Sequence, residues 1–384
     1  MEEKNIQNLL IEIICSTVNE EESNNSIKEK ITPELLVEVY RLAKKHDLAH
    51  MVSDFVYKNK IEVPPELGAR LQREEIMSVY RYEQMKFAFE EICESFDNAE
   101  IAYIPLKGSV IRPYYPRESM RTSCDIDILI REEALESAIS ILVAKGYECK
   151  ERNYHDVSLH SPNNIHLELH FNIQENMDNL DAVLKDVWEY ALPVSDSRYE
   201  LSKEFFAFHI FAHMAYHFVS GGCGIRPLLD IWIMEHRMGV SYSQAKELLE
   251  KAGIYQFSAE MSKLAELCFT HNDRDPFYDS VLKYIFQGGV YGNKKNNIAV
   301  HKSKKKSSFS YLIKRLFLPY RYMNVAYPIL KKAPYLLPIY WIFRWIKALF
   351  GGKSKLIVSE MTYANNMADD DIKEILDIWS RLDL

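Results

Sequence analysis

Hydrophobic residues recur at helical spacing through the first hundred positions. Thr32-Pro33 has the form of an N-cap followed by a first-turn proline, and Pro64-Pro65 opens a long helical stretch that runs to about Asp97. The spacing of three and four is clearest near the N-terminus, at Ile6, Leu9, Leu10, Ile13, Ile14 and Val18. The pattern predicts an N-terminal helical region over residues 1–98.

The pattern then changes to short apolar and alternating runs that are typical of strands. A helix is expected between them, over Glu132 to Ala144, ending at Gly146. The predicted strands are Ile101 to Leu106, Cys124 to Ile130, His155 to His160 and Ile165 to Phe171. Residues 99–195 should therefore form a core with a small mixed sheet.

Helical periodicity returns after Asn179. It covers Asp181 to Leu192 and Phe205 to Val219 and continues to about Cys268, which predicts a helical domain at 196–286. A polar, basic linker is expected at 287–310. Residues 311–384 then form a basic aromatic segment and a C-terminal acidic amphipathic helix, Asp370 to Leu382. The predicted fold class is α/β (α+β), with a small mixed sheet flanked by N-terminal and C-terminal helical regions.

Composition narrows the class of protein. The chain has 384 residues, of which 47% are hydrophobic and 27% charged, so it is neither disordered nor collagen-like. Its six cysteines are scattered without any C-x-x-C pair, which argues against a cysteine zinc site and fits a reducing compartment. The charged N-terminus has no apolar signal-peptide core. We therefore expect a cytoplasmic protein.

Charge is unevenly distributed along the chain. The net charge is −8, yet sixteen Lys and Arg residues and no acid lie between Asp279 and Glu360. The most apolar part of this stretch, Ala333 to Phe350, contains Pro338, Arg344 and Lys347, and no transmembrane segment is expected. Aromatic residues accompany the cations over 302–355. This segment could contact a membrane surface, a nucleic acid or the acidic body of the protein itself.

Candidate chemistry lies on two of the predicted strands. Asp125 and Asp127 are two residues apart, so both carboxylates project from one face, and a divalent cation such as Mg²⁺ or Mn²⁺ would relieve their repulsion. The turn Gly108-Ser109 precedes them between a strand and a helix, with Lys107 and Arg121 as phosphate-binding candidates. Alternation over Ile165 to His170 predicts that His166, Glu168 and His170 share a face, with Glu168 as a third carboxylate.

These motifs resemble the nucleotidyltransferase superfamily that includes DNA polymerase beta. Leu106-Lys107-Gly108-Ser109, followed by Arg121 and Asp125-Ile126-Asp127-Ile128-Leu129-Ile130, is most similar to a bacterial family of uncharacterised nucleotidyltransferases. The similarity is most specific over Ile101 to Phe171 and covers about two thirds of the chain. Fifteen residues separate Ser109 from Asp125, which is longer than the usual superfamily spacing.

The resemblance implies transfer of a nucleoside monophosphate, often AMP, from an NTP to an acceptor, with release of pyrophosphate. Asp125, Asp127 and Glu168 would hold metal, with Glu168 alternatively acting as general base, and Gly108 and Ser109 would seat the phosphates. The acceptor could be a small molecule, a protein hydroxyl or tRNA, although overall acidity argues against a long nucleic acid. Three alternatives remain: a solvated strand end, a non-catalytic nucleotide-binding or interaction protein that retains the fold, and a membrane-peripheral adaptor.

Histidines form a second candidate group. His209, His213 and His217 are four residues apart on one predicted helix, where they could bind zinc, face the core near Arg226 with hydrogen bonds to groups such as Asp230, or contact the acceptor. His166 and His170 could likewise orient Glu168 or contact the acceptor. The resemblance implies histidines of the helical domain that face the catalytic cleft, so His213 and His217, together with His170, are the acceptor-binding candidates.

Overall fold

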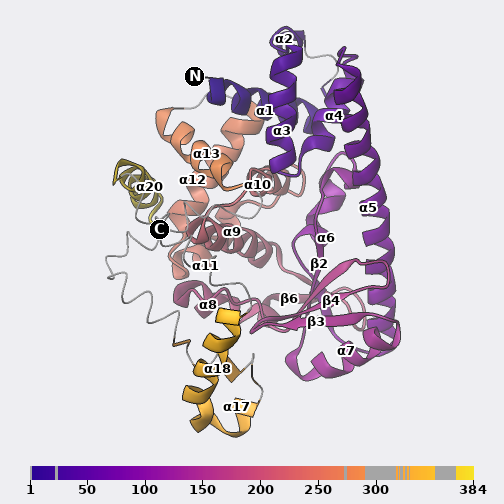
Figure 1. The fold of residues 1–384 in the computed structure, drawn as a ribbon, viewed down its shortest axis with the longest axis vertical. Coiled ribbons are helices and arrows are strands. Elements are labelled where there is room, and N and C mark those ends of the chain that lie inside the picture. The colour runs from indigo at the N-terminus through magenta and orange to yellow at the C-terminus, as the bar shows by residue number, and fades with distance from the viewer. Residues whose placement is uncertain are drawn as a thin grey trace.

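The computed structural model describes residues 2–21, 25–271, 275–289, 317, 318, 320, 323, 324, 327, 329–350 and 369–384. Helices dominate this part of the chain, and a five-stranded sheet lies beside the lower part of the long helix α5 (Figure 1). The N-terminal helices are α1 (Glu2–Val18), α2 (Asn25–Lys28), α3 (Pro33–Lys45), α4 (Ala49–Lys58) and α5 (Pro65–Asn98). Thr32 caps α3 by accepting a hydrogen bond from the Leu35 N–H, as its sequence predicts.

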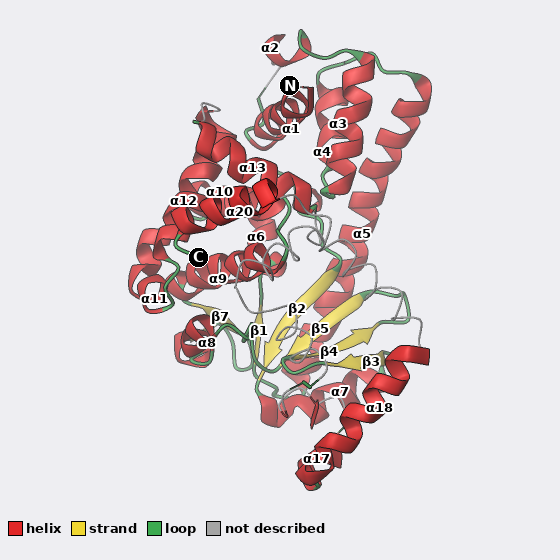
Figure 2. Ribbon diagram, turned by 60° about the vertical axis from the view of Figure 1, so that its left-hand side comes forward, coloured by secondary structure: helices red, strands yellow, loops and turns green. Residues whose placement is uncertain are grey.

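The sheet is mixed, with strand order β1-β2-β5-β4-β3. β2 and β5 run parallel at its centre, and each of the other pairings is antiparallel (Figure 2). The strands are β1 (Tyr103–Pro105), β2 (Asp125–Ile130), β3 (Glu148–Arg152), β4 (Asp156–His160) and β5 (His166–His170). The predicted mixed α/β fold is confirmed.

One face of the sheet is covered by α5 and α7 (Leu135–Ala144). Ile126 and Ile128 of β2 pack there in one hydrophobic cluster with Phe96 of α5 and Leu142 of α7. Alternation then directs Asp125 and Asp127 to the other face. The apolar residues of β2 thus fix the side on which the carboxylates lie.

The other face meets a larger, mostly helical core. Ile104 and Leu129 of the sheet join a cluster that contains residues of α1, α3 and α4 as well as of the later helices. Those later helices are α6 (Gly108–Ile111), α8 (Asp178–Leu184), α9 (Lys203–Ser220), α10 (Arg226–His236), α11 (Lys246–Lys251), α12 (Tyr255–Glu266) and α13 (Pro276–Gly288). The N-terminal helices therefore share a core with the helices of 196–286, while the boundaries at 98, 195, 286 and 310 stay predictions.

Two predicted elements differ from the structure. Glu148–Arg152 forms strand β3, which hydrophobic alternation could not reveal because all five of its side chains are exposed. The helix expected over Asp181 to Leu192 ends at Leu184, and Ala191–Pro193 instead forms β6, which pairs with β7 (Tyr199–Leu201). Cross-strand pairing replaced the helix there.

The C-terminal part is described in sections. α17 (Ile329–Lys332), α18 (Leu337–Phe350) and α20 (Asp369–Leu382) are helical, and α20 confirms the predicted terminal helix. From residue 290 the predicted basic linker lies outside the described residues. Within the described chain, each helix is too short or too polar to cross a membrane.

Candidate functional site

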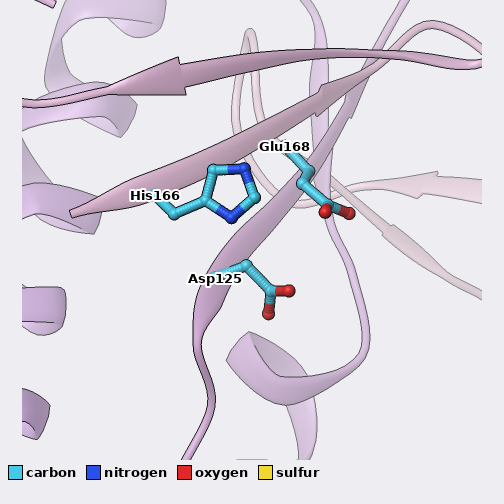
Figure 3. Close-up of side chains that lie close together, drawn as sticks. All are labelled: Asp125, His166 and Glu168. Carbon is cyan, nitrogen blue, oxygen red and sulfur yellow. The ribbon is translucent and has the colours of Figure 1, made fainter. Parts of the chain in front are cut away.

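Carboxylates from β2 and β5 meet on the face of the sheet opposite α5 and α7. The parallel register places Asp125 beside His166 and Asp127 beside Glu168. Figure 3 shows the side chains of Asp125, His166 and Glu168 projecting from the same side of the two strands. Asp125, His166 and Glu168 form one group whose ligand atoms lie within 4.8 Å of one another, and Asp127, Glu168 and His170 form a second. The structure thus brings together the three predicted carboxylates.

Asp127 is the charge centre of this cluster. Its Oδ1 accepts hydrogen bonds from Lys107 Nζ at 3.1 Å and from His170 Nε2 at 3.0 Å. Burial alone would raise the pKa of Asp127, but Lys107 and His170 outweigh burial and hold that pKa well below its usual range. The hydrogen bond to Asp127 and the nearby Glu168 carboxylate likewise overcome burial and raise the pKa of His170 to about 9. Asp127 is therefore a carboxylate held ionised between two cations.

Asp125 experiences the opposite balance. Burial raises its pKa, and the negative charges of Asp127 and Glu168 raise it further. The three acids repel one another, and the ionised form of Asp125 is the least favourable. A bound cation would therefore stabilise the group. Carboxylate oxygens are ligands that Mg²⁺ and Mn²⁺ prefer, so the donor set fits such an ion.

The two strand histidines differ in their surroundings. His166 Nε2 lies 2.8 Å from the Ser158 hydroxyl, and its ring stacks on that of His160. His170 is buried, and besides Asp127 its Nε2 lies 3.6 Å from Glu168 Oε2. His170 therefore orients carboxylates here, and its role toward an acceptor stays a prediction.

The Lys107–Ser109 turn is tied directly to this cluster. The Leu106 N–H donates to the Asp127 carbonyl at 3.0 Å, which anchors the turn to β2. Lys107 has φ 43° and ψ −108°, an unfavourable conformation for a residue with a side chain, and strain of this kind is concentrated at functional turns. A Cβ at Gly108 would lie 2.5 Å from Arg121 Nη1, so a larger residue here would have to displace the Arg121 guanidinium.

Arg121 is held by a buried ion pair. Its Nη2 lies 2.9 Å from Asp230 Oδ2 and its Nε 3.3 Å from Oδ1, while the Tyr115 hydroxyl donates to Oδ1 at 2.7 Å. Asp230 raises the pKa of Arg121 despite burial, so the guanidinium stays charged. The structure thus places the Arg121 guanidinium against Gly108. Direct contact of Arg121 with phosphate stays a prediction.

Comparison with known proteins places the chain in a family. The model of a family described as uncharacterised nucleotidyltransferase matches residues 36–301. The chain belongs to this family. A solution structure of the antibiotic-resistance factor ANT(2'')-Ia is similar at 13% sequence identity and a TM-score of 0.28, over 50% of this chain and 94% of that one. Among curated proteins, none matches.

In this member of the family, the helical histidines form a chain of contacts. The His213 Nδ1–H donates to Glu175 Oε1 at 2.9 Å, and His217 Nε2 lies 3.1 Å from His213 Nε2. Asp230, named from the sequence as a possible partner of the histidines, pairs with Arg121 instead, and Glu175 takes that place for His213. Burial and the charge of Lys107 lower the pKa of His209 to about 3 and that of His213 well below its usual value.

Sequence reasoning missed Glu175, Tyr115 and the pairing of Asp230 with Arg121. Glu175 lies in the irregular segment between β5 and α8, where no periodicity marks it. Asp230 is 109 positions from Arg121, so no local pattern joins them. Only the tertiary fold could reveal these partners.

Proposed function

We propose that this protein is a metal-dependent nucleotidyltransferase that moves a nucleoside monophosphate from an NTP, with ATP favoured, to an acceptor and releases pyrophosphate. The observation that carries the proposal is the convergence of Asp125, Asp127 and Glu168 on neighbouring parallel strands beside the Gly108-Ser109 turn. Family membership supports the same reaction class.

Asp125, Asp127 and Glu168 would hold Mg²⁺ or Mn²⁺. Such an ion supplies charge stabilisation for the triphosphate and lowers the pKa of a coordinated hydroxyl. His170 holds Asp127 in place through its hydrogen bond, as residues behind metal ligands commonly do.

Lys107 and the turn would receive the phosphates. The Lys107 ammonium contacts Asp127 and is also within the electrostatic influence of Asp125 and Glu168, which places a largely buried cation beside the cluster. A metal ion bound by the carboxylates would weaken the ion pair between Lys107 and Asp127, so that the ammonium could bind a phosphate oxygen instead. Arg121 supports the turn from below as a positioning residue, because its guanidinium is fixed by Asp230.

The acceptor would approach from the side of α9. His213 and His217 lie on that helix, where burial lowers the pKa of His217 while the charges of Glu175 and, to a smaller extent, Glu168 oppose that shift. In the chain from Glu175 through His213 to His217, a neutral His213 donates a hydrogen bond from Nδ1 to Glu175 and accepts one at Nε2 from His217. Such a chain would orient an acceptor hydroxyl of a small molecule, protein or tRNA.

The deciding experiment is calorimetric binding of ATP, GTP, CTP and UTP with and without Mg²⁺. Wild type should bind in a metal-dependent manner, and Asp125→Ala/Asp127→Ala should not. Glu151→Ala, an exposed acid on β3, is the matched control and should bind as wild type does. Folded wild type that binds no nucleotide would contradict the proposal, and binding without pyrophosphate release over an acceptor screen would favour the non-catalytic alternative.

A further inference from the structure

One face of helix α18 carries a continuous row of exposed apolar side chains. Ile339, Ile342, Phe343 and Ile346 follow helical spacing and expose 51%, 50%, 64% and 48% of their surfaces. Tyr335, one turn earlier, is 79% exposed. Soluble proteins rarely leave large apolar residues contiguous in this way, and such patches usually mark an interaction surface.

The opposite face of α18 is already occupied. Trp341 Nε1 donates to the Leu318 carbonyl at 2.8 Å, and the Phe317 ring packs edge-on against Trp341 and Trp345 with centroid distances of 5.0 and 5.2 Å. Tyr340 packs against Tyr327 with ring centroids 4.8 Å apart. These contacts fix the rotation of the helix, so the row defined by Ile339, Ile342, Phe343 and Ile346 faces outward.

The basic residues in the sequence before and after α18 indicate a negatively charged partner. The chain between Asp279 and Glu360 has sixteen basic residues and no acid, whereas the protein as a whole is acidic. Lys332, just before α18, is exposed. An apolar row set in a basic segment is complementary to a surface that is negatively charged outside and apolar beneath.

We propose that α18 binds the surface of an anionic lipid bilayer. The helix would lie in the interfacial plane with its apolar row among the upper acyl chains, because at 14 residues it is only about 21 Å long and cannot span the bilayer. Three of the four side chains in the row are isoleucines, which have no flat face on which bases can stack, and Phe343 is its single aromatic member, so the row favours lipid over single-stranded nucleic acid. The surface is separate from the carboxylate cluster and does not depend on the proposed transfer reaction.

The experiment is co-sedimentation of the full chain with vesicles of phosphatidylcholine alone or mixed with phosphatidylglycerol, at low and high salt. Wild type should bind the anionic vesicles at low salt, and Ile339→Ser/Phe343→Ser should weaken the partition by about tenfold or more. Ile76→Ser/Phe87→Ser is the matched control, because these α5 residues are 58% and 66% exposed, and it should bind as wild type does. Circular dichroism and nucleotide binding, measured in parallel, should be the same for all three proteins.

Several outcomes would overturn the proposal. Wild type that binds neither vesicle would remove lipid as the partner, and equal binding by Ile339→Ser/Phe343→Ser would remove α18. Sedimentation equilibrium tests whether the apolar row is instead a dimer interface. A dimer that forms without lipid and is lost in the same variant, with no vesicle binding, would assign the row to a second copy of the chain. Tight binding of single-stranded RNA with no vesicle binding would assign the segment to nucleic acid.

Discussion

Asp127 joins the carboxylate cluster to the turn that precedes it. Its side chain accepts hydrogen bonds from Lys107 and His170, and its carbonyl accepts one from the Leu106 N–H. A change at Asp127 therefore alters the charge of the cluster while the backbone connection survives. This separation makes Asp127 a suitable residue for testing chemistry apart from folding.

We expect Asp127→Asn to remain folded and to lose metal-dependent NTP turnover. The amide keeps the shape but removes the anion, so turnover should fall on the order of 100-fold or more. Because Lys107 and His170 lose their counter-charge, the free energy of unfolding should also fall by about 1–3 kcal/mol. Pyrophosphate release and circular dichroism measure the two effects, with Glu151→Gln as control. Turnover at the wild-type rate would remove Asp127 from the mechanism.

Gly108 tests the turn itself. In Gly108→Ala the new methyl group would meet Arg121 Nη1 at 2.5 Å, and the guanidinium cannot withdraw freely because Asp230 holds it. The free energy of unfolding should fall by about 1–3 kcal/mol, and nucleotide affinity should fall with it. Gly68→Ala in α5 is the comparison, since its Cβ would lie 3.3 Å from Val63 Cγ2, a tight contact that a shift of a few tenths of an ångström relieves. Urea unfolding that does not separate the two variants would show that Arg121 yields easily.

At the scale of elements, the Arg121–Asp230 pair connects the segment before β2 to α10. Removing one partner leaves the other charged and buried, which costs about 3–5 kcal/mol. We therefore expect Arg121→Met and Asp230→Asn each to be strongly destabilising. The double variant should cost much less than the sum of the two, because no uncompensated charge remains. Urea denaturation of the four proteins gives the coupling, and strictly additive losses would mean that the pair does not link the elements.

The sequence predicted those strands in which burial of one face leaves a visible alternation of apolar and polar residues. β2 and β5 alternate apolar with polar residues because one face packs against α5 and α7 while the other carries the carboxylates. β3 has no buried face, and its position depends on its pairing with β4. The carboxylate cluster could be predicted because Asp125 and Asp127 lie on one strand and Glu168 on a patterned neighbour. The partners of Glu175 and Asp230 could not be predicted, because they lie 38 and 109 positions away on elements that only the tertiary fold brings together.

At the scale of the whole molecule, His46 connects the N-terminal helices to the later ones. It follows α3, and its Nε2–H donates to the Phe286 carbonyl of α13 at 3.2 Å, while its Nδ1 accepts from the Ile225 N–H at 3.4 Å. Both nitrogens are thus satisfied by the neutral imidazole. Protonation of Nδ1 would replace an acceptor with a donor facing another donor. Burial lowers the pKa of His46 to about 4, and the neighbouring charge of Lys45 acts in the same direction.

This geometry predicts a loss of stability in mild acid. Between the ordinary histidine pKa of about 6.5 and the folded value of about 4, the unfolded chain binds more protons at this site, so stability falls as pH falls through that window. From pH 7 to pH 5 the His46 contribution is about 2 kcal/mol. In urea unfolding, the free energy of unfolding of His46→Gln should decrease between pH 7 and pH 5 by about 2 kcal/mol less than that of wild type. This comparison holds even if the substitution changes the stability at pH 7. His160→Gln removes a partly exposed imidazole and serves as the control. If His46→Gln has the same pH dependence as wild type, the junction of α3, α10 and α13 tolerates the imidazolium and the prediction is wrong.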